Sequence, residues 1–150
     1  MPIKTIYGDI TVTDCNVIAH GCNCFCVMGA GVALALKKKW PAIHLADKAT
    51  VAGNASKLGT FSRCVVDDKV VYNLYTQYFY GRGKRHFDYD AFHSALKAMH
   101  DNLKNTAQDY SKVRIAMPRI GAGLAGGAWD IIKGIIEDEF PDEEITIYSM

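Results

Sequence analysis

The chain has 150 residues, of which 49% are hydrophobic and 22% are charged, as is typical of a globular protein. This length corresponds to one domain. A domain of this size buries roughly two thirds of its unfolded surface, so it needs no disulfide or metal to fold. The net charge of +1 excludes a bulk electrostatic attraction to nucleic acid or to anionic membranes. Any anion that the chain binds must therefore be held by local geometry.

Five cysteines occur in the chain, at positions 15, 22, 24, 26 and 64. An odd number of cysteines favours reduced thiols over a disulfide framework. Residues 1–9 lack the apolar stretch of a signal peptide, so we expect a cytoplasmic protein. No apolar stretch has the length of a membrane span, so we expect no membrane partner. We also expect a monomer.

The first third of the chain predicts two strands and a helix. Residues 3–7 have the pattern of a strand that ends at Gly8-Asp9, and residues 15–20 form a short apolar run typical of a buried strand. A helix is predicted over residues 32–40, because lysines gather near its end, where the helix dipole favours cations. Pro41 either ends this helix or begins the next one.

The rest of the chain alternates between strand-like and helix-like segments. The predicted strands cover residues 61–66, 70–76, 113–117 and 144–148, and the predicted helices cover residues 90–104 and 128–140. A turn at Asp67-Asp68 joins the first two of these strands. The alternation predicts one α/β domain over residues 1–150. Its mixed, largely parallel central sheet would carry helices on both faces, which is a three-layer α/β/α arrangement.

Both later helices show an apolar stripe that would face the core. In the helix over 90–104 the stripe consists of Phe92, Leu96, Met99 and Leu103, with Asp88 or Asp90 as the N-cap. In the helix over 128–140 it consists of Trp129, Ile132, Ile136 and Phe140.

The sharpest local feature is a glycine-rich segment between the strand over 113–117 and the last helix. It contains glycines at positions 121, 123, 126 and 127. Glycines let the backbone approach a ligand closely, and the free amides of a helix start favour phosphate. The alternative is a plain strand–helix turn. The segment matches the pattern G-x-G-x-x-G, but a Rossmann domain carries that loop after its first strand, and no GxxxxGK[ST] motif of a P-loop occurs.

A second glycine-containing loop, nearer the N-terminus, also leads from a strand to a helix. Gly29, Ala30, Gly31 and Val32 begin a helix shortly after a strand. Ligands of open α/β sheets bind outside the carboxyl ends of the strands. We therefore expect the two loops to hold one pyrophosphate between them.

The segment His20-Gly-Cys22-Asn23-Cys24-Phe25-Cys26 leaves three interpretations open. Structural zinc sites space their cysteines by two to four residues and need a second cluster, whereas this spacing is C-x-C-x-C. A nucleophilic cysteine would need a basic partner that the sequence does not reveal. Free cysteines also commonly fill small buried gaps. We expect the last of these, and neither a metal nor a cofactor.

The stretch from Tyr75 to Tyr89 mixes aromatic and basic residues. Its aromatics could stack the bases of single-stranded nucleic acid. The alternative is a glycine-bearing rim loop that packs on the domain through its own tyrosines, and the small net charge favours this second interpretation.

The ordered set of these motifs resembles the macro domain family. The set consists of Gly8-Asp9-Ile10, His20-Gly-Cys-Asn23, Gly29-Ala-Gly-Val-Ala33, Ile120-Gly-Ala-Gly-Leu124 and Ile145-Thr-Ile-Tyr148. Within the family the chain is most similar to a small branch. That branch holds the yeast-type ADP-ribose-1″-phosphate phosphatase, the human terminal ADP-ribose protein glycohydrolase, and phage and bacterial relatives. A viral source would place the protein in the host cytoplasm.

The resemblance implies a site for ADP-ribose or a derivative, with an ADP-ribosylated macromolecule as a further partner. Asp9 would accept from the adenine amino group with help from the Ile10 amide, Tyr148 would stack on adenine, and Asn23 would face the distal ribose. The residues implied at the diphosphate and distal ribose are Gly29, Ala30, Gly31 and Val32 on one side and Gly121, Ala122, Gly123, Leu124 and Ala125 on the other.

The chain departs from the family where catalysis is concerned. The resemblance implies a lysine where this chain has Gln77, and aspartates where it has Ala125 and, in phage and bacterial relatives, Ala128. His20 is then the remaining titratable candidate for a general acid or base. The alternative is that His20 is a structural histidine at a strand end, with its hydrogen bonds satisfied within the protein. The resemblance favours hydrolysis at the distal ribose, and the departures favour a non-catalytic reader of ADP-ribose. A single-stranded nucleic-acid binder is a third hypothesis.

Overall fold

The computed structural model describes residues 3–80, 86–123 and 125–149. They contain a six-stranded sheet with the order β1-β6-β5-β2-β4-β3. The strands are β1 (Lys4–Tyr7), β2 (Val17–Asn23), β3 (Phe61–Val66), β4 (Lys69–Gln77), β5 (Arg114–Pro118) and β6 (Glu144–Ser149). All neighbouring strands are parallel except the edge strand β3, which is antiparallel to β4. The predicted mixed, largely parallel sheet is confirmed.

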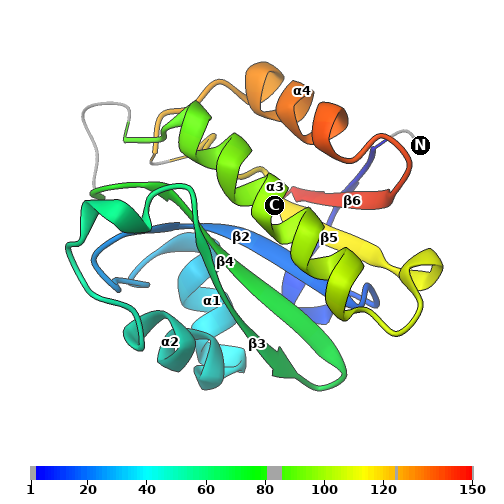
Figure 1. Ribbon diagram of the computed structural model, residues 1–150, viewed down its shortest axis with the longest axis horizontal. Helices are drawn as coiled ribbons and strands as arrows, with labels where there is room; N and C mark the ends of the chain where they lie inside the picture. The colour runs from blue at the N-terminus through cyan, green and yellow to red at the C-terminus, as the bar shows by residue number, and fades with distance from the viewer. Residues whose placement is uncertain (1–2, 81–85, 124, 150) are drawn as a thin grey trace.

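Four α-helices and three short 3-10 helices accompany the sheet. They are α1 (Gly31–Lys39), α2 (Pro41–Lys48), α3 (Tyr89–Thr106), α4 (Trp129–Glu139), η1 (Ile10–Val12), η2 (Ala55–Lys57) and η3 (Tyr110–Lys112). Helices α1 and α2 cover one face of the sheet, and α3 and α4 cover the other (Figure 1). Each face has its own buried apolar cluster. The arrangement is therefore α/β/α, as predicted. Within the described residues, no helix has both the length and the apolar character needed to cross a membrane.

Local chemistry explains most of the element boundaries. Pro41 occupies the first turn of α2, where its missing amide costs nothing. Asp67 and Asp68 both have positive φ, 46° and 63°, and make the tight turn between β3 and β4. The carboxylate of Asp88 accepts a hydrogen bond from the Ala91 amide and caps α3.

Strand β2 differs from its predicted range of residues 15–20, since it runs from Val17 to Asn23. Its later residues pair with β4 instead of forming a loop, for example His20 with Asn73. A Cβ atom added at Gly21 would lie 2.9 Å from the Thr76 hydroxyl oxygen, so this glycine is needed for strand packing.

The topology brings the sequence motifs to one edge of the sheet. The carboxyl ends of parallel strands lie at the same edge, so the segments that follow β1, β2 and β5 meet there beside the end of β6. Strand β2 leads into α1 on one face, and its neighbour β5 leads into α4 on the opposite face (Figure 1). Open α/β sheets bind ligands at such a switch point.

Candidate functional site

A cavity of about 440 Å³, here called the edge cleft, lies at this switch point. It is lined by Ile10, Val32, Pro118, Arg119, Ala122, Gly123, Gly127, Trp129, Tyr148 and Ser149. Five residues predicted to bind the ligand are among them: Ile10, Val32, Ala122, Gly123 and Tyr148. The tertiary structure therefore brings together segments that lie more than 130 residues apart.

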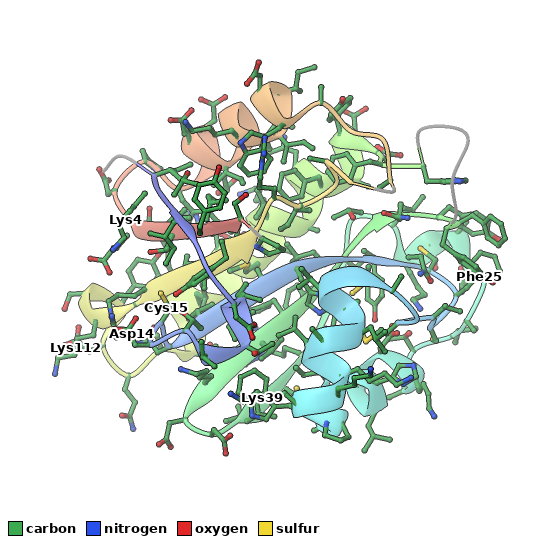
Figure 2. All side chains as sticks on the ribbon, turned by 180° about the vertical axis from the view of Figure 1, so that it is seen from behind. Lys4, Asp14, Cys15, Phe25, Lys39 and Lys112 are labelled. Carbon is green, nitrogen blue, oxygen red and sulfur yellow. The ribbon has the colours of Figure 1, made fainter. Side chains whose placement is uncertain are left out.

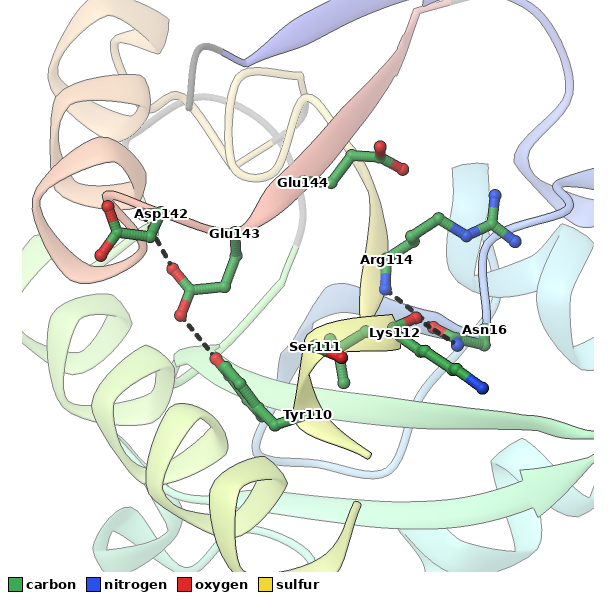
Figure 3. A pocket seen from close by; sticks show the side chains of 9 residues that line it. Asn16, Tyr110, Ser111, Lys112, Arg114, Asp142, Glu143 and Glu144 are labelled. Carbon is green, nitrogen blue, oxygen red and sulfur yellow. Dashed lines mark hydrogen bonds between the residues drawn. The ribbon is translucent and has the colours of Figure 1, made fainter. Parts of the chain in front are cut away.

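A larger cavity, of about 780 Å³, lies near the other end of the molecule, beside η3 and the start of β6 (Figure 3). Its polar groups already bond to one another. The Tyr110 hydroxyl donates to Glu143 over 2.6 Å, and the Asn16 amide donates to the Lys112 carbonyl over 2.9 Å. Figure 2 shows Lys112 at the opposite end of the molecule from Phe25, which follows β2. We place the candidate site in the edge cleft, because two helices begin there without a side-chain cap and, among the described residues, the Gly123 amide has no acceptor.

Asp9 and Tyr148 stand where β1 and β6 reach this edge. The Oδ1 atom of Asp9 accepts from the Thr11 hydroxyl over 2.7 Å and from the Thr11 amide over 2.9 Å. These hydrogen bonds, that of the hydroxyl first, lower the pKa of the Asp9 carboxyl. Asp9 is exposed, not buried or half-buried as expected for an adenine acceptor. The Tyr148 hydroxyl donates to the Thr13 hydroxyl over 2.7 Å, which fixes the orientation of its ring.

Two uncapped helices begin at the edge cleft. The N-cap residues are Ala30 for α1 and Ala128 for α4, and neither makes a side-chain capping hydrogen bond. By contrast, Asp88 caps α3, and α2 begins with Pro41, which has no amide. Among the described residues, no side chain accepts from the first-turn amides of α1 and α4. These amides carry the positive end of the helix dipole, which suits an anion.

The glycines after β5 serve different purposes. Gly121 has φ 74°, and a Cβ atom there would overlap the Phe87 ring. A Cβ atom at Gly127 would lie 2.8 Å from the Gly121 carbonyl oxygen. Only open space surrounds the Cβ position of Gly123, and within the described residues its amide has no acceptor. Gly123 is therefore the glycine of this loop that leaves room for a ligand.

The neighbouring loop residues have other surroundings. Ala125 is buried, and its carbonyl accepts from the His86 amide over 2.8 Å. Leu124, predicted to bind the ligand, lies outside the described residues.

Asn23 closes a turn after β2. Its side-chain amide donates to the Val27 carbonyl over 2.9 Å, and its carbonyl accepts from the Phe25 amide over 2.8 Å. This turn leads to Gly29 and Ala30, which are exposed. Gly31 follows with φ 58°, and no atom lies within 4 Å of its Cβ position. In this structure Asn23 shapes the first loop through its own hydrogen bonds.

His20 is not in the edge cleft, and the prediction that it points there is wrong. The residue lies in the middle of β2, is 1% exposed, and its Nε2 lies 2.6 Å from Oδ1 of Asn73. Burial lowers the pKa of its imidazole, so the ring is neutral. The sequence interpretation failed because β2 continues three residues past His20 and sets it back from the edge.

The cysteines of this segment are consistent with the gap-filling interpretation. Cys15, Cys22 and Cys24 are buried, and burial raises the pKa of the Cys22 and Cys24 thiols. Thiols held in the protonated form are poor nucleophiles. Within residues 3–80, 86–123 and 125–149, no group of three side chains suits a metal ion.

Aromatic side chains pack on one another beside the first loop. The Phe25 ring meets those of Tyr78 and Phe79 edge-on, with centroids 4.9 and 5.3 Å apart. The Tyr78 hydroxyl donates to the Gly53 carbonyl over 2.8 Å. These contacts are those of a rim that packs through its own aromatics. Residues 81–85, which carry most of the basic side chains of this stretch, lie outside the described residues.

Two large side chains that line the edge cleft, Arg119 and Trp129, were not expected there from the sequence. Trp129 shares the helical spacing of Ile132 and Ile136 and was assigned to the core stripe, but it is only partly buried and lines the cleft. Its place at the first residue of a helix that follows a glycine-rich loop is the signal that could have identified it.

Comparisons with known proteins agree with this geometry. The sequence profile of the macro domain family matches residues 19–136. A 17.5 kDa protein encoded in the tk-vs intergenic region of Enterobacteria phage T4 is 40% identical, over 98% of this chain and 96% of that protein. Human ADP-ribose glycohydrolase OARD1 is 31% identical, over 99% and 91%. ADP-ribose 1″-phosphate phosphatase of Debaryomyces hansenii is 24% identical, over 97% and 98%.

Proteins of lower sequence identity also share this fold. The macrodomain of Mycobacterium tuberculosis DarG has a TM-score of 0.77 at 21% identity, over 98% of this chain and 97% of that chain. The family profile covers most of the sheet and both cleft loops, and the phage T4 relative aligns over nearly the whole length. The chain belongs to the macro domain family.

Proposed function

We propose that this chain binds ADP-ribose in the edge cleft and hydrolyses a bond at the distal ribose. The substrate would be an ADP-ribosylated target or ADP-ribose 1″-phosphate. One observation carries the proposal: the uncapped starts of α1 and α4 meet at one cleft together with the open amide of Gly123. Two sets of unpartnered donors facing each other suit a diphosphate. The names of the human and fungal relatives support the substrate class.

The ligand would lie along the carboxyl edge of the sheet. Adenine would stack on Tyr148 and donate its amino group to Asp9, whose Oδ2 has no partner among the described residues. The diphosphate would lie between the amides near Val32 and Gly123. The distal ribose would then point toward the end of β2, beside the turn that Asn23 closes.

The catalytic groups of this cleft are few. Among the described residues, no Asp, Glu, His, Lys or Cys side chain lines it. Gln77, at the implied lysine position, donates to the Phe79 carbonyl over 2.8 Å. Hydrolysis would therefore depend on water held by backbone groups, and we expect slow turnover, because a positioned acid or base contributes about 100- to 10,000-fold. The same absence favours a second candidate function, a reader that binds ADP-ribose without turnover.

Calorimetry followed by activity assays distinguishes these functions. The purified chain is titrated with ADP-ribose and then assayed on ADP-ribosylated protein, ADP-ribosylated DNA and ADP-ribose 1″-phosphate. Binding with turnover of any substrate supports the hydrolase. Binding without turnover supports the reader, and absence of binding refutes both. Saturation with single-stranded DNA or RNA in place of ADP-ribose would support the nucleic-acid hypothesis instead.

The N-cap of α4 provides a test of catalysis. Ala128 is exposed and has extended backbone angles, φ −87° and ψ 118°, which suit a capping side chain. We expect Ala128→Asp to raise the stability by about 1 kcal/mol through capping. It should also weaken ADP-ribose binding, because the cap occupies an α4 amide proposed to hold the diphosphate, and raise turnover at saturating substrate by supplying an acid–base group. Ala128→Asn is the matched control, because it caps equally but cannot transfer the proton. Equal turnover of the two variants would show that no carboxylate acts from this position.

A further inference from the structure

Arg119 is the only charged residue among those that line the edge cleft in the described part of the chain. It follows the end of β5, and Pro118 before it pairs with Tyr148 in β6. The side chain is exposed, and its guanidinium carbon lies 5.3 Å from the centroid of the Trp129 ring. Within the described residues it forms no ion pair with a carboxylate.

The stacking on Trp129 leaves the guanidinium ready for an anion. A planar guanidinium that lies on an aromatic ring keeps its five N–H donors in its own plane, where they can meet a phosphate. The indole also restricts the side chain, so less conformational entropy is lost on binding. An unpaired cation held in this way on the wall of a nucleotide cleft is a phosphate-recognition feature.

The position of Arg119 indicates which phosphate it would meet. The diphosphate already has the amides of both loops as partners. Adenine lies against Tyr148, so the ribose that joins it to the diphosphate lies between Tyr148 and Gly123. Arg119 lines the same cleft as these two residues and lies over the ring of Trp129, the first residue of α4. An arginine beside the adenosine ribose is how dinucleotide sites accommodate a 2′-phosphate.

We propose that Arg119 recognises a phosphate on the 2′-oxygen of the adenine-bearing ribose, and that the chain binds 2′-phosphorylated ADP-ribose in preference to ADP-ribose. The inference rests on the proposed ADP-ribose site. The guanidinium would form a bidentate, charge-assisted pair with the phosphate while it stays stacked on Trp129. The substrate class then includes ADP-ribose units derived from 2′-phosphorylated dinucleotides.

The test compares two ligands by calorimetry on the whole chain: ADP-ribose and its 2′-phosphate. We expect the 2′-phosphate to bind about tenfold more tightly at low salt, with the difference shrinking at high salt. In Arg119→Gln the ratio of the two affinities should fall to about one, whatever the change in the affinity for ADP-ribose itself. Arg114→Gln is the matched control, because Arg114 begins the same strand but pairs with Asp14 at the opposite end.

Three results would overturn the proposal. The first is equal or weaker binding of the 2′-phosphate by the unmodified chain. The second is a preference that survives in Arg119→Gln. Adenosine 2′,5′-bisphosphate and adenosine 3′,5′-bisphosphate serve as smaller probes of position, and equal affinity for the two isomers would also refute it. Failure of the proposed function has a different signature, since neither ADP-ribose nor its 2′-phosphate would then bind.

Discussion

Among single residues, Asp9 uses one carboxylate oxygen for local structure and, among the described residues, leaves the other without a partner. Both of its hydrogen bonds from Thr11 fall on Oδ1, and they favour the ionised form. The carboxylate is therefore charged and oriented before a ligand arrives. A similar arrangement occurs in η3, where Asp109 accepts from the Ser111 amide and hydroxyl. The two aspartates cap alike, but only Asp9 stands beside the edge cleft.

We expect Asp9→Ala to weaken ADP-ribose binding by about tenfold or more, because it removes the charged acceptor of the adenine amino group. Binding of ribose 5-phosphate, which lacks adenine, should barely change. The measurement is calorimetry with both ligands. Asp109→Ala removes an equivalent cap far from the cleft and should leave both affinities unchanged. An unaltered affinity of Asp9→Ala for ADP-ribose would refute the assignment.

His20 contributes to stability instead of chemistry. Its pKa is lowered by burial, so below the ordinary value of about 6.5 the unfolded chain binds a proton that the folded state excludes. Stability is therefore lost as the pH falls through that value. We expect the free energy of unfolding to drop more between about pH 7.5 and pH 5.5 in the unmodified chain than in His20→Gln. Urea denaturation at the two pH values measures this, and identical drops would contradict the assignment.

Among the elements, the loop after β5 contains one glycine that the backbone needs and another that borders the space available to a ligand. Gly121 needs its missing side chain because of a left-handed φ and the adjacent Phe87 ring, whereas Gly123 borders open space. A side chain at Gly121 therefore damages the fold, and one at Gly123 fills the cleft. A similar trade-off applies to the starts of α1 and α4. Neither helix has the side-chain cap that would stabilise it, and both begin at the proposed ligand site.

We expect Gly123→Glu to abolish ADP-ribose binding while the Tm stays nearly unchanged, because the new side chain blocks the diphosphate without disturbing the core. Gly121→Ala should instead lower the stability by at least about 1 kcal/mol, from the left-handed φ alone. Thermal melts and calorimetry on the same samples separate the two effects. Gly134→Glu, at an open position within α4, controls for added charge. Retained binding in Gly123→Glu would move the ligand elsewhere.

At the scale of the whole molecule, a buried polar network holds the α3–α4 layer against the sheet. Nδ1 of His100 lies 2.8 Å from Glu139, and its Nε2 lies 3.0 Å from Glu143. The Tyr110 hydroxyl also donates to Glu143, which raises the pKa of the tyrosine after the larger effect of burial. Through the His100 imidazole and the Glu143 carboxylate, the network thus links α3, α4, η3 and the turn before β6. The network lies beside the larger cavity and away from the edge cleft.

Removing that imidazole should destabilise the fold without affecting the ligand. We expect His100→Ala to cost about 3 kcal/mol, because it takes a hydrogen-bond partner from each of two largely buried carboxylates. Lys97→Ala breaks an exposed pair with Asp101 on the same helix and should cost less than about 1 kcal/mol. Denaturant titration gives both values. If His100→Ala lost ADP-ribose affinity at temperatures where it stays folded, the expected independence of this network from the edge cleft would be contradicted.

The α/β class, the alternation of elements and the two glycine-containing loops could be predicted from the sequence alone. These features depend on local periodicity and on glycines that follow strands, both of which are readable along the chain. The loop around Gly123 could be predicted from its place between a strand and a helix. Asp9 and Tyr148 were expected only from the resemblance to the macro domain family.

The distance of each side chain from the carboxyl edge of the sheet, and what surrounds it, depends on the tertiary fold. Pairing with β4 carries β2 three residues beyond His20 and removes that histidine from the cleft. The Phe87 ring explains Gly121, and the stacking of Arg119 on Trp129 joins two loop ends that are ten residues apart. Strand register and contacts between distant segments fix these features, and neither has a local signature because a one-residue shift of register redirects every side chain.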